Sequence, residues 1–547
     1  MKSTRILLTL FLVLLVAIGL IGCSSNTTKD DEKDDQDTAQ NETDDSTDDS
    51  DEDADEPAAS GGTLRIAYSA QPPSLDQHLS TAAATTEIMG SVYEQLISVD
   101  SEYQIVPQLA ESFEQSDDGL EITFKLREGV LFHNGKEMKA EDVVASMNRW
   151  KDLPGGRGQF DDAIFEEIDE YTVVFKLDKP LSTALTALSQ GGTTFSGIMP
   201  KEVVEAADET GVTEFIGTGP FKFVEWAHDQ HVKLEKFDDY VSQEGESNGL
   251  VGEKAALVDE IIFEFVLDPS TRVAGIQSGQ YDIVHNIPND NAILLEGTPG
   301  LVSHVASGIS TMVAIPNKSR GIFSDVRARE MLAALIDYDE VMTAAYADPQ
   351  YYRLSHGMML EPQEAYWYSE QGKEKFYQND PEKAKKILEE IGYDGETVTI
   401  ITDREYVTHY NAAVVLQKQL ESIGMNVELQ VYDWATLLDK VKDPNEEYDL
   451  YAMGHSLRAD PTAIYYFGKG EGGFTESEEL DQLLEEFRNQ PTLDDTKEVF
   501  DRIQKWHWEY IPALKLGEVS RTEFSTDKVE GLRHQGRMLL WNVSKSE

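Results

Sequence analysis

Cysteine is nearly absent from this sequence, since Cys23 is the single cysteine among 547 residues. A chain with one cysteine can form no internal disulfide, and it cannot supply a group of thiolates to a zinc ion. The chain beyond Cys23 also has no cysteine nucleophile. A protein of this length buries enough surface to hold a large core without covalent cross-links.

Long apolar segments are also scarce, because residues 6–22 form the one run that approaches the length of a membrane span. Lys2 and Arg5 precede this run, and small Gly22 stands directly before Cys23. A positive start, an apolar run and a small residue, in that order, are typical of a secretory signal. The alternative is an uncleaved transmembrane anchor, which needs about 20 apolar residues. The sequence therefore predicts an exported protein with a signal peptide over residues 1–22.

Basic residues are few: 46 Lys and Arg stand against 102 Asp and Glu, and the net charge is −56. This balance argues against nucleic acid or an anionic lipid surface as a binding partner. Residues 24–60 are acidic and of low complexity, so we expect them to form an extended disordered linker. The acidic body does not by itself identify a cationic ligand, because a salty or alkaline habitat favours the same composition.

Motifs of enzymes are missing as well. Residues 454–458, GHSLR, begin like a nucleophile elbow but lack its second glycine. The sequence contains neither H-E-x-x-H nor the phosphate-binding G-x-x-x-x-G-K-[ST], and its histidines show no helical pairing. We therefore expect no catalytic residues, no metal site and no cofactor.

The body of the chain alternates strand and helix patterns, and its length predicts two or more lobes. Residues 62–69 form a strand pattern, and a helix is predicted around residues 83–97. Two alternating strands, 120–126 and 171–177, flank a helix predicted over 140–150.

The clearest unit lies between residues 380 and 454. Asp380 and Pro381 begin a helix that Gly392 ends. The later elements are a strand over 397–402, a helix over 409–423, a strand over 425–433, a helix over 434–441 and a strand over 448–454. Strands separated by helices indicate a parallel α/β sheet. Ligands bind beyond the carboxyl ends of such strands, where Arg404 and Arg458 lie in loops 403–406 and 455–461.

One long segment carries a family resemblance. Residues 107–149 resemble the signature of the family 5 solute-binding proteins, the peptide, nickel and glutathione receptors of ABC importers. The matching positions are Pro107, Leu109, Ala110, Ser112, Gly119, Phe124, Leu126, Arg127, Gly129, Phe132, Gly135, Ala140, Asp142 and Val143. Further similar blocks are residues 217–221, 323–337, 380–395, 419–434 and the strand around Pro512.

This resemblance implies an α/β, two-lobed periplasmic-binding-protein-like fold of type II, with an extra subdomain in the first lobe and a hinge between the lobes. The lipid-anchored acidic linker would cover residues 23–61. Lobe I would comprise residues 62–99, 215–310 and 518–547, with the inserted subdomain over 100–214, and lobe II would comprise residues 311–517. The crossing strands are expected near 310–316 and 512–518.

The resemblance also implies a function. The chain is expected to be a monomeric extracytoplasmic receptor of an ABC importer, not an enzyme, with the permease as its partner. Residues 20–23 resemble a lipoprotein box, so a lipid on Cys23 is expected to hold the protein on the outer face of the cell membrane. A peptide or glutathione-like ligand is favoured. The alternatives are a metal chelate, an oligosaccharide, or a sensor that presents its ligand to a signalling partner.

Candidate ligand-binding residues follow from the same resemblance. Ser456 and Arg458 lie in a segment similar to the S-G-R-x-D-P pattern of glutathione-type receptors, and an arginine can grip a carboxylate through two hydrogen bonds. Arg404 and Tyr406 resemble the R-x-Y that holds the carboxylate in dipeptide receptors. Trp434 matches a tryptophan at the cleft rim.

In the first lobe, Tyr68, Ser69, Thr85 and Thr86 occupy positions expected to face the ligand. Alternatives stay open for several of these candidate residues. Arg458 could pair with Asp460 or another acid, Arg404 and Tyr406 could belong to a surface loop, and Trp434 could pack in the core.

Overall fold

The computed structural model describes residues 61–156, 160, 162–189, 191–192, 194–456, 458 and 460–546. The predicted signal peptide, Cys23 and residues 24–60 lie outside these residues, so the lipid anchor stays a prediction. Within the described part of the chain, no helix has the length and apolar character needed to cross a bilayer.

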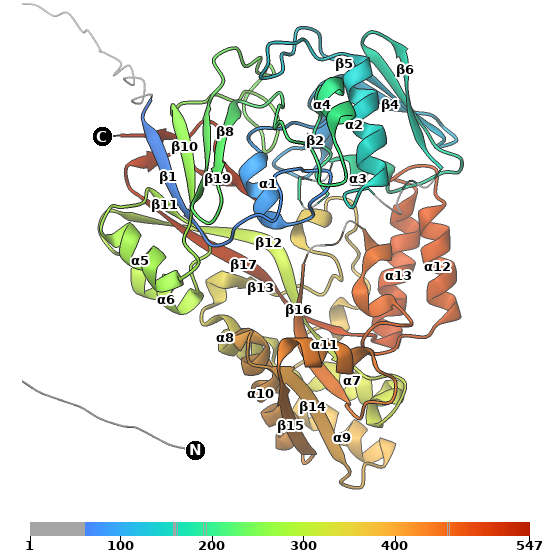
Figure 1. Ribbon diagram of the computed structural model, residues 1–547. Helices are drawn as coiled ribbons and strands as arrows, with labels where there is room; N and C mark the ends of the chain where they lie inside the picture. The colour runs from blue at the N-terminus through green and yellow to red at the C-terminus, as the bar shows by residue number, and fades with distance from the viewer. Residues whose placement is uncertain are drawn as a thin grey trace, which may run out of the picture. The chain divides into compact units, whose positions relative to one another are not determined.

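One large mixed sheet runs through the protein in the order β15-β14-β16-β12-β17-β11-β1-β10-β9-β8, with β13 added beside β17. We call the part built on β1 and β8 to β11 lobe I, and the part built on β14 to β16 lobe II (Figure 1). The strands of this sheet are β1 (Thr63–Tyr68), β8 (Phe221–Ala227), β9 (His231–Lys236), β10 (Glu260–Phe265), β11 (Ile283–Val284), β12 (Leu301–Pro316), β13 (Tyr352–Arg353), β14 (Thr397–Asp403), β15 (Asn426–Tyr432), β16 (Leu450–Ser456) and β17 (Leu514–Thr526).

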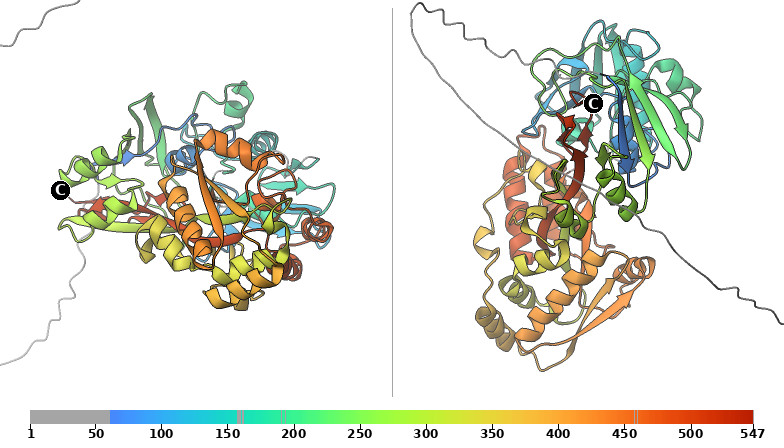
Figure 2. Two further views of the ribbon diagram at one scale, coloured as in Figure 1. Left: turned by 90° about the horizontal axis from the view of Figure 1, so that it is seen from below. Right: turned by 90° about the vertical axis from the view of Figure 1, so that its left-hand side faces the viewer.

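Two long strands connect the lobes. β12 pairs antiparallel with β17 from Leu301 to Ala314, and it pairs with β16 from Ser310 onward. A register shift between Ala306 and Ser310 interrupts the β12–β17 ladder. Figures 1 and 2 show both strands running side by side from one lobe into the other. The predicted two-lobed fold is confirmed, and the residue-level boundaries of the lobes stay a prediction.

Lobe I carries helices α1 (Ala83–Met89), α5 (Pro269–Gln277) and α6 (Asn289–Leu295). A separate four-stranded sheet, in the order β4-β5-β7-β6, packs with helices beside it (Figure 1). Its elements are β4 (Ala110–Gln115), β5 (Glu121–Leu126), α2 (Ala140–Asp152), β6 (Ile164–Asp169), β7 (Thr172–Lys176), α3 (Ala184–Ser189) and α4 (Lys201–Ala206). The predicted strands over 120–126 and 171–177 and the predicted helix over 140–150 are therefore confirmed.

The remaining short pairs in lobe I and at the chain's end are two-stranded. They are β2 (Ile97–Val99) with β3 (Ile105–Pro107), β18 (Val529–Glu530) with β21 (Ser544–Lys545), and β19 (Arg533–His534) with β20 (Met538–Leu539).

Lobe II confirms the parallel unit. β14 pairs in parallel with both β15 and β16, so the carboxyl ends of these strands meet at one edge. Its helices are α7 (Val326–Leu335), α8 (Tyr338–Tyr346), α9 (Pro381–Ile391), α10 (Val407–Ser422), α11 (Trp434–Lys442), α12 (Glu478–Arg488) and α13 (Thr496–Tyr510). The 3₁₀ turns are Ile322–Ser324, Pro349–Tyr351, Glu361–Gln363, Lys373–Lys375, Pro461–Ala463 and Tyr465–Phe467.

The ends of α9 form as the sequence predicts. The Asp380 side chain accepts a hydrogen bond of 2.9 Å from the Lys383 backbone N–H, and Pro381 is the first helical residue. Gly392 ends the helix with φ at +81°, a conformation that favours glycine. The Asp380 cap contributes about 1 kcal/mol.

The helix predicted over residues 83–97 is wrong in its second half, because α1 ends at Met89. The next carbonyls are used by a distant segment. Ser91 O accepts from Phe221 N–H at 3.2 Å, and Val92 O accepts from Gly219 N–H at 2.9 Å. These tertiary hydrogen bonds override the local helical preference.

Candidate ligand-binding cleft

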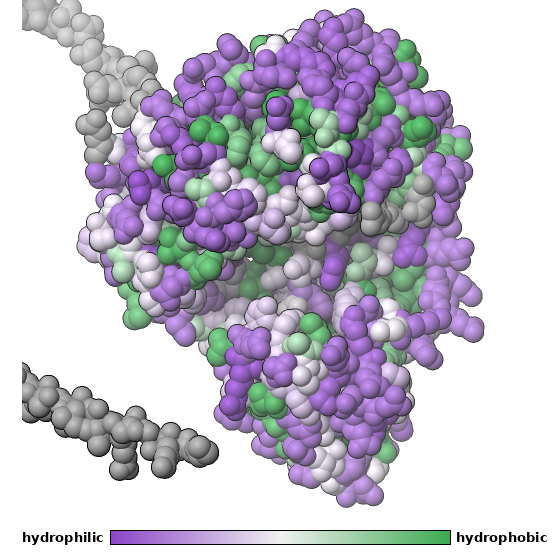
Figure 3. Space-filling view, viewed as in Figure 1, coloured by the Kyte–Doolittle hydropathy of each residue, from purple (hydrophilic) through white to green (hydrophobic). Residues whose placement is uncertain are grey.

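A cavity of about 240 Å³ lies between the two lobes and opens to solvent. The space-filling view shows the surface hollowed between the lobes on this face (Figure 3). Three groups of residues form its walls. The lobe I side contributes residues of α1, Val99, Tyr103, Ile105, Thr186, Ser189, Gly191, Gly192, Leu250, Gln535, Gly536 and Arg537. Lobe II contributes Pro362, Gln363, Tyr366, Trp367 and Ser456, and the crossing strands contribute Gly308, Ile309 and Arg521.

The lobe II wall is aromatic. Tyr366 and Trp367 line the cavity, and Tyr103 lines it from lobe I. The Trp367 indole N–H donates to the Thr496 hydroxyl at 3.1 Å, so the ring is held in place from behind. The Tyr366 hydroxyl accepts a 2.6 Å hydrogen bond from the Ile105 backbone N–H, which joins the two lobes directly. Such a wall suits an apolar side chain of a ligand.

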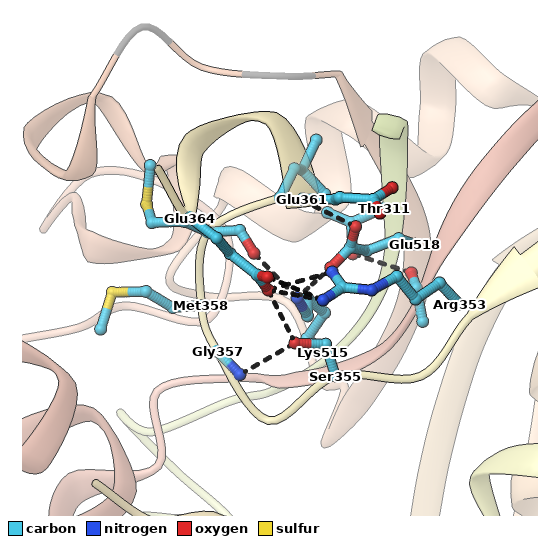
Figure 4. A network of polar contacts seen from close by, with 12 residues as sticks. Thr311, Arg353, Ser355, Gly357, Met358, Glu361, Glu364, Lys515 and Glu518 are labelled. Atoms are coloured by element: carbon cyan, nitrogen blue, oxygen red, sulfur yellow. Dashed lines mark hydrogen bonds and ion pairs between the residues drawn. The ribbon is translucent and has the colours of Figure 1, made fainter. Parts of the chain in front are cut away.

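A network of charges fastens the segment that carries these aromatic residues (Figure 4). Arg353 on β13 forms ion pairs with Glu364 at 2.7 Å and with Glu518 on β17 at 2.9 Å. Glu518 also accepts from the Glu361 backbone N–H at 2.9 Å. Segment 361–367 is therefore tied to a crossing strand through Glu361 and Glu364.

Lys515 completes this network from β17. Its ammonium donates to Glu518 at 2.8 Å and to the Met359 carbonyl at 2.9 Å. Burial lowers the pKa of Lys515, and the carboxylate of Glu518 opposes that shift. Because these charges are paired and hydrogen-bonded, each one depends on the others for compensation.

The lobe I wall carries charges that face the cavity. Arg521 on β17 pairs with Glu87 on α1 at 3.3 Å and with Glu523 at 2.7 Å. Glu523 also contacts His534. Burial raises the pKa of Glu87. Burial also works to raise the pKa of Glu523, but Arg521 and His534 hold it below its ordinary value.

Arg537 is the second cation in the cavity wall, and it is 5 % exposed. Its guanidinium donates to the carbonyls of Gly191 at 3.0 Å and Gly90 at 3.2 Å, and it lies 5.0 Å from the centre of the Phe195 ring. Burial lowers the pKa of Arg537 to about 10.

Of four residues predicted from the sequence, Ser456, Thr85, Tyr68 and Ser69, only the first is part of the cavity wall. Ser456 lies at the carboxyl end of β16. Thr85 is buried, and its hydroxyl donates to Ser74 O at 2.6 Å. Tyr68 stacks on His285 at 4.2 Å, and Ser69 contacts the same ring at 2.8 Å. Tyr68, Ser69 and Thr85 are therefore engaged within lobe I.

Three further predicted residues gather at the carboxyl edge of β14 and β15. The Tyr406 and Trp434 rings lie 5.0 Å apart, and Arg404 lies 5.0 Å from the centre of the Tyr410 ring. Arg404 and Tyr406 are exposed, with Tyr406 at 50 %. None of the three lines the cavity as it stands.

A buried pair holds this edge together. The Asp403 carboxylate lies 2.7 Å from His409 Nδ1, and the Gly454 backbone N–H donates to His409 Nε2 at 2.9 Å. The histidine therefore joins the ends of β14 and β16, and burial lowers its pKa.

Arg458 is exposed and lines a separate surface pocket with Lys469 and Arg488. Its backbone remains next to the cavity, because the Arg458 carbonyl accepts from the Gln363 side chain at 2.6 Å. Asp460 is buried and accepts from the Thr462 backbone N–H at 2.7 Å, so it shapes the loop that follows Arg458.

Sequence reasoning missed most of the cavity wall. Glu87, Arg521 and Arg537 come from segments far apart in the chain, and no local motif joins them. Tyr366 and Trp367 lie in an irregular segment between β13 and α9. The pair Thr85 and Thr86 on α1 was the nearest signal, since Thr86 and the following Glu87 line the cavity.

Two α/β lobes, a pair of crossing strands and a cavity between the lobes define a periplasmic-binding-protein-like fold. The family model described as bacterial extracellular solute-binding proteins, family 5, matches residues 104–475. The chain belongs to this family, which is one of binding proteins and not of enzymes. The resemblance of residues 107–149 to the family 5 solute-binding proteins is therefore confirmed.

Individual relatives agree. The probable peptide ABC transporter periplasmic-binding protein y4tO of Sinorhizobium fredii is 29% identical over 500 residues, which cover 86% of this chain and 91% of that protein. The oligopeptide-binding protein AppA of Bacillus subtilis is 26% identical over 517 residues, covering 89% and 91%. The crystal structure of the ABC transporter substrate binding protein CtaP of Listeria monocytogenes has the same fold, with a TM-score of 0.78 and 22% identity over 89% of this chain and 100% of that one.

Proposed function

We propose that this protein is the receptor of an ABC importer and captures a peptide or peptide-like ligand between its lobes. The observation that carries the proposal is the cavity lined from both lobes, with aromatic rings on one wall and buried charges on the other. A peptide offers both an apolar side chain and charged groups. The relatives y4tO and AppA are named for peptides, which supports the same class of cargo.

The residues predicted from the sequence find a place in this proposal. Ser456 would contact the ligand in the cavity. Arg404, Tyr406, Trp434 and Arg458 lie at the edge where β14, β15 and β16 end, so they would meet the parts of a longer ligand that extend beyond the cavity. Tyr68, Ser69 and Thr85 would support the lobe I wall. Delivery requires a permease, and closure of the lobes would present the loaded form to it.

A ligand screen by thermal unfolding tests the proposed cargo. A ligand at 100 times its Kd stabilises the folded form by about 2.7 kcal/mol, which raises the Tm by a few degrees. We expect di- to oligopeptides or glutathione to produce this shift. The proposal fails if only nickel chelates or oligosaccharides raise the Tm. A sensor that presents its ligand to a signalling partner would bind the same ligands. The absence of permease and ATPase genes beside this one would favour that alternative.

We also propose that a lipid on Cys23 anchors the protein outside the cell membrane. The Cys23→Ala variant should leave the membrane fraction and appear in the medium or the soluble extracytoplasmic fraction. Ser24→Ala, which changes the next residue, is the matched control and should stay with the membrane. Retention of both variants in the membrane fraction would contradict lipidation of Cys23.

A further inference from the structure

The tip of a small hairpin enters the cavity from lobe I. Strands β19 and β20 pair through His534 and Met538, and the residues between them, Gln535 to Arg537, all line the cavity. Gly536 has φ at +68°, so this tight turn uses a backbone conformation that favours glycine. The turn therefore fixes where the Arg537 side chain begins.

The Arg537 side chain is also fixed at its far end. Its two terminal nitrogens donate to the carbonyls of Gly90 and Gly191, and its Cζ lies over the Phe195 ring. A Cβ atom at Gly90 would come within 2.6 Å of the guanidinium, so the fit at this point requires a glycine. A guanidinium held in one orientation loses little further freedom when it binds a ligand.

Arg537 has hydrogen-bonding capacity left over. Within the described part of the chain, its Nε has no hydrogen-bond partner, and no carboxylate forms an ion pair with its guanidinium. The other cation in the cavity wall, Arg521, is paired with Glu87 and Glu523. Buried charges are costly unless an opposite charge compensates them.

Arg329 is another buried arginine that donates to carbonyls. The comparison between it and Arg537 shows what distinguishes Arg537 from an arginine that only packs in the core. Arg329 donates to Tyr510 O at 2.9 Å and to Phe323 O at 2.7 Å, and it lies 4.8 Å from the centre of the Tyr510 ring. Arg329 is outside the cavity, whereas Arg537 forms part of its wall, so only Arg537 adjoins the space that a ligand would fill.

We propose that Arg537 binds a carboxylate of the ligand, while the apolar part of the ligand lies against Tyr103, Tyr366 and Trp367. This inference rests on the proposed peptide-binding function and specifies its ligand class as peptides with a free carboxylate and an apolar side chain. Hydrogen bonds between a guanidinium and a carboxylate are among the strongest in proteins. The ligand's carboxylate would form the direct ion pair that neither Glu87 nor Glu94, the carboxylates whose charges act on Arg537, makes with it.

The experiment compares synthetic tripeptides with free carboxyl ends against the same tripeptides as carboxyl amides. Calorimetry measures the affinity of each for the mature protein and for the variants Arg537→Gln, Arg537→Lys and Arg329→Gln. The wild type should bind the acids at least tenfold more tightly than the amides. Arg537→Gln should remove this preference, so that the variant binds each acid and its amide with equal affinity.

The two other variants separate charge recognition from damage to the fold. Arg537→Lys should keep part of the preference, because it retains the charge without the fork of donors. Arg329→Gln removes a similar buried arginine outside the cavity and should keep the full preference. A preference that survives in Arg537→Gln, or equal binding of acids and amides by the wild type, overturns the role of Arg537 alone. If no peptide binds the wild type, the proposed function fails as well.

Discussion

The hydroxyl of Tyr366 accepts a hydrogen bond of 2.6 Å from the Ile105 backbone N–H. Tyr366 belongs to the lobe II wall of the cavity and Ile105 to β3 on the side of lobe I, so this bond spans the cleft. We infer that it stabilises the conformation in which the two walls lie this close together.

Tyr366→Phe should therefore weaken ligand binding by about threefold to tenfold, because a neutral hydrogen bond contributes about 0.5–1.5 kcal/mol. Calorimetry measures the affinity, and small-angle scattering shows whether the ligand still closes the lobes. Tyr368→Phe is the control, since Tyr368 is 48 % exposed and contacts Glu370. Equal affinities for both variants and the wild type would show that the Tyr366 bond does not contribute to closure.

Glu518 is the acid on which the network around Arg353 depends, and it is 1 % exposed. Glu518→Gln removes the charge paired with Lys515 and one of the two charges paired with Arg353, the other being Glu364. Breaking a buried pair from one side costs about 3–5 kcal/mol, so we expect the free energy of unfolding to fall by that amount. Urea unfolding measures it.

The control for this change is Glu447→Gln. Glu447 pairs with Arg320 at 3.1 Å, but its side chain is 86% exposed. An exposed ion pair contributes at most about 1 kcal/mol. If Glu518→Gln destabilised the protein no more than Glu447→Gln, the network would not hold segment 361–367 in place.

Arg458 gives a test of the sequence-based hypothesis. Its side chain is exposed beside Lys469 and Arg488, and its backbone adjoins the cavity through Gln363. Arg458→Ala should weaken the binding of a peptide with an acidic side chain more than tenfold, because charged hydrogen bonds contribute about 1.5–3 kcal/mol. Binding of the matching glutamine peptide should change less than twofold. Arg327→Ala on α7 is the control, and an unchanged affinity of Arg458→Ala for the acidic peptide would remove Arg458 from the site.

The parts of the fold that the sequence predicts well depend on local signals. Asp380, Pro381 and Gly392 define α9 because each acts on its own helix end. The helix predicted over 83–97 fails where the signal is not local. The carbonyls of Ser91 and Val92 bond to the segment that leads into β8, and no pattern within residues 83–97 indicates that partner.

The same contrast between local signals and contacts of distant segments applies to the residues of the cleft. Ser456 could be predicted because the carboxyl end of a parallel strand is a known place for ligands. The cavity walls could not be predicted, because α1, residues 362–367 and the β19–β20 hairpin meet only in the folded chain. Arginine, glutamate and tyrosine are common on protein surfaces, so their cleft positions carry no signature in the sequence.

His133 makes stability depend on pH in a defined direction. Its Nε2 lies 2.9 Å from Gly219 O, and its Nδ1 accepts from the Gly217 backbone N–H at 3.2 Å, an arrangement that needs the neutral ring. Burial lowers the pKa of His133 to about 4. As the pH falls, the unfolded chain binds a proton at His133 at a higher pH than the folded chain does. The contribution of the neutral ring to the free energy of unfolding is therefore complete above pH 6.5 and declines as the pH falls toward 4. The difference in unfolding free energy between the wild type and His133→Gln should therefore shrink by about 2 kcal/mol from pH 7 to pH 5. His228→Gln, at an exposed histidine, should stay within about 0.5 kcal/mol of the wild type, and a pH-independent difference for His133→Gln would contradict the neutral buried ring.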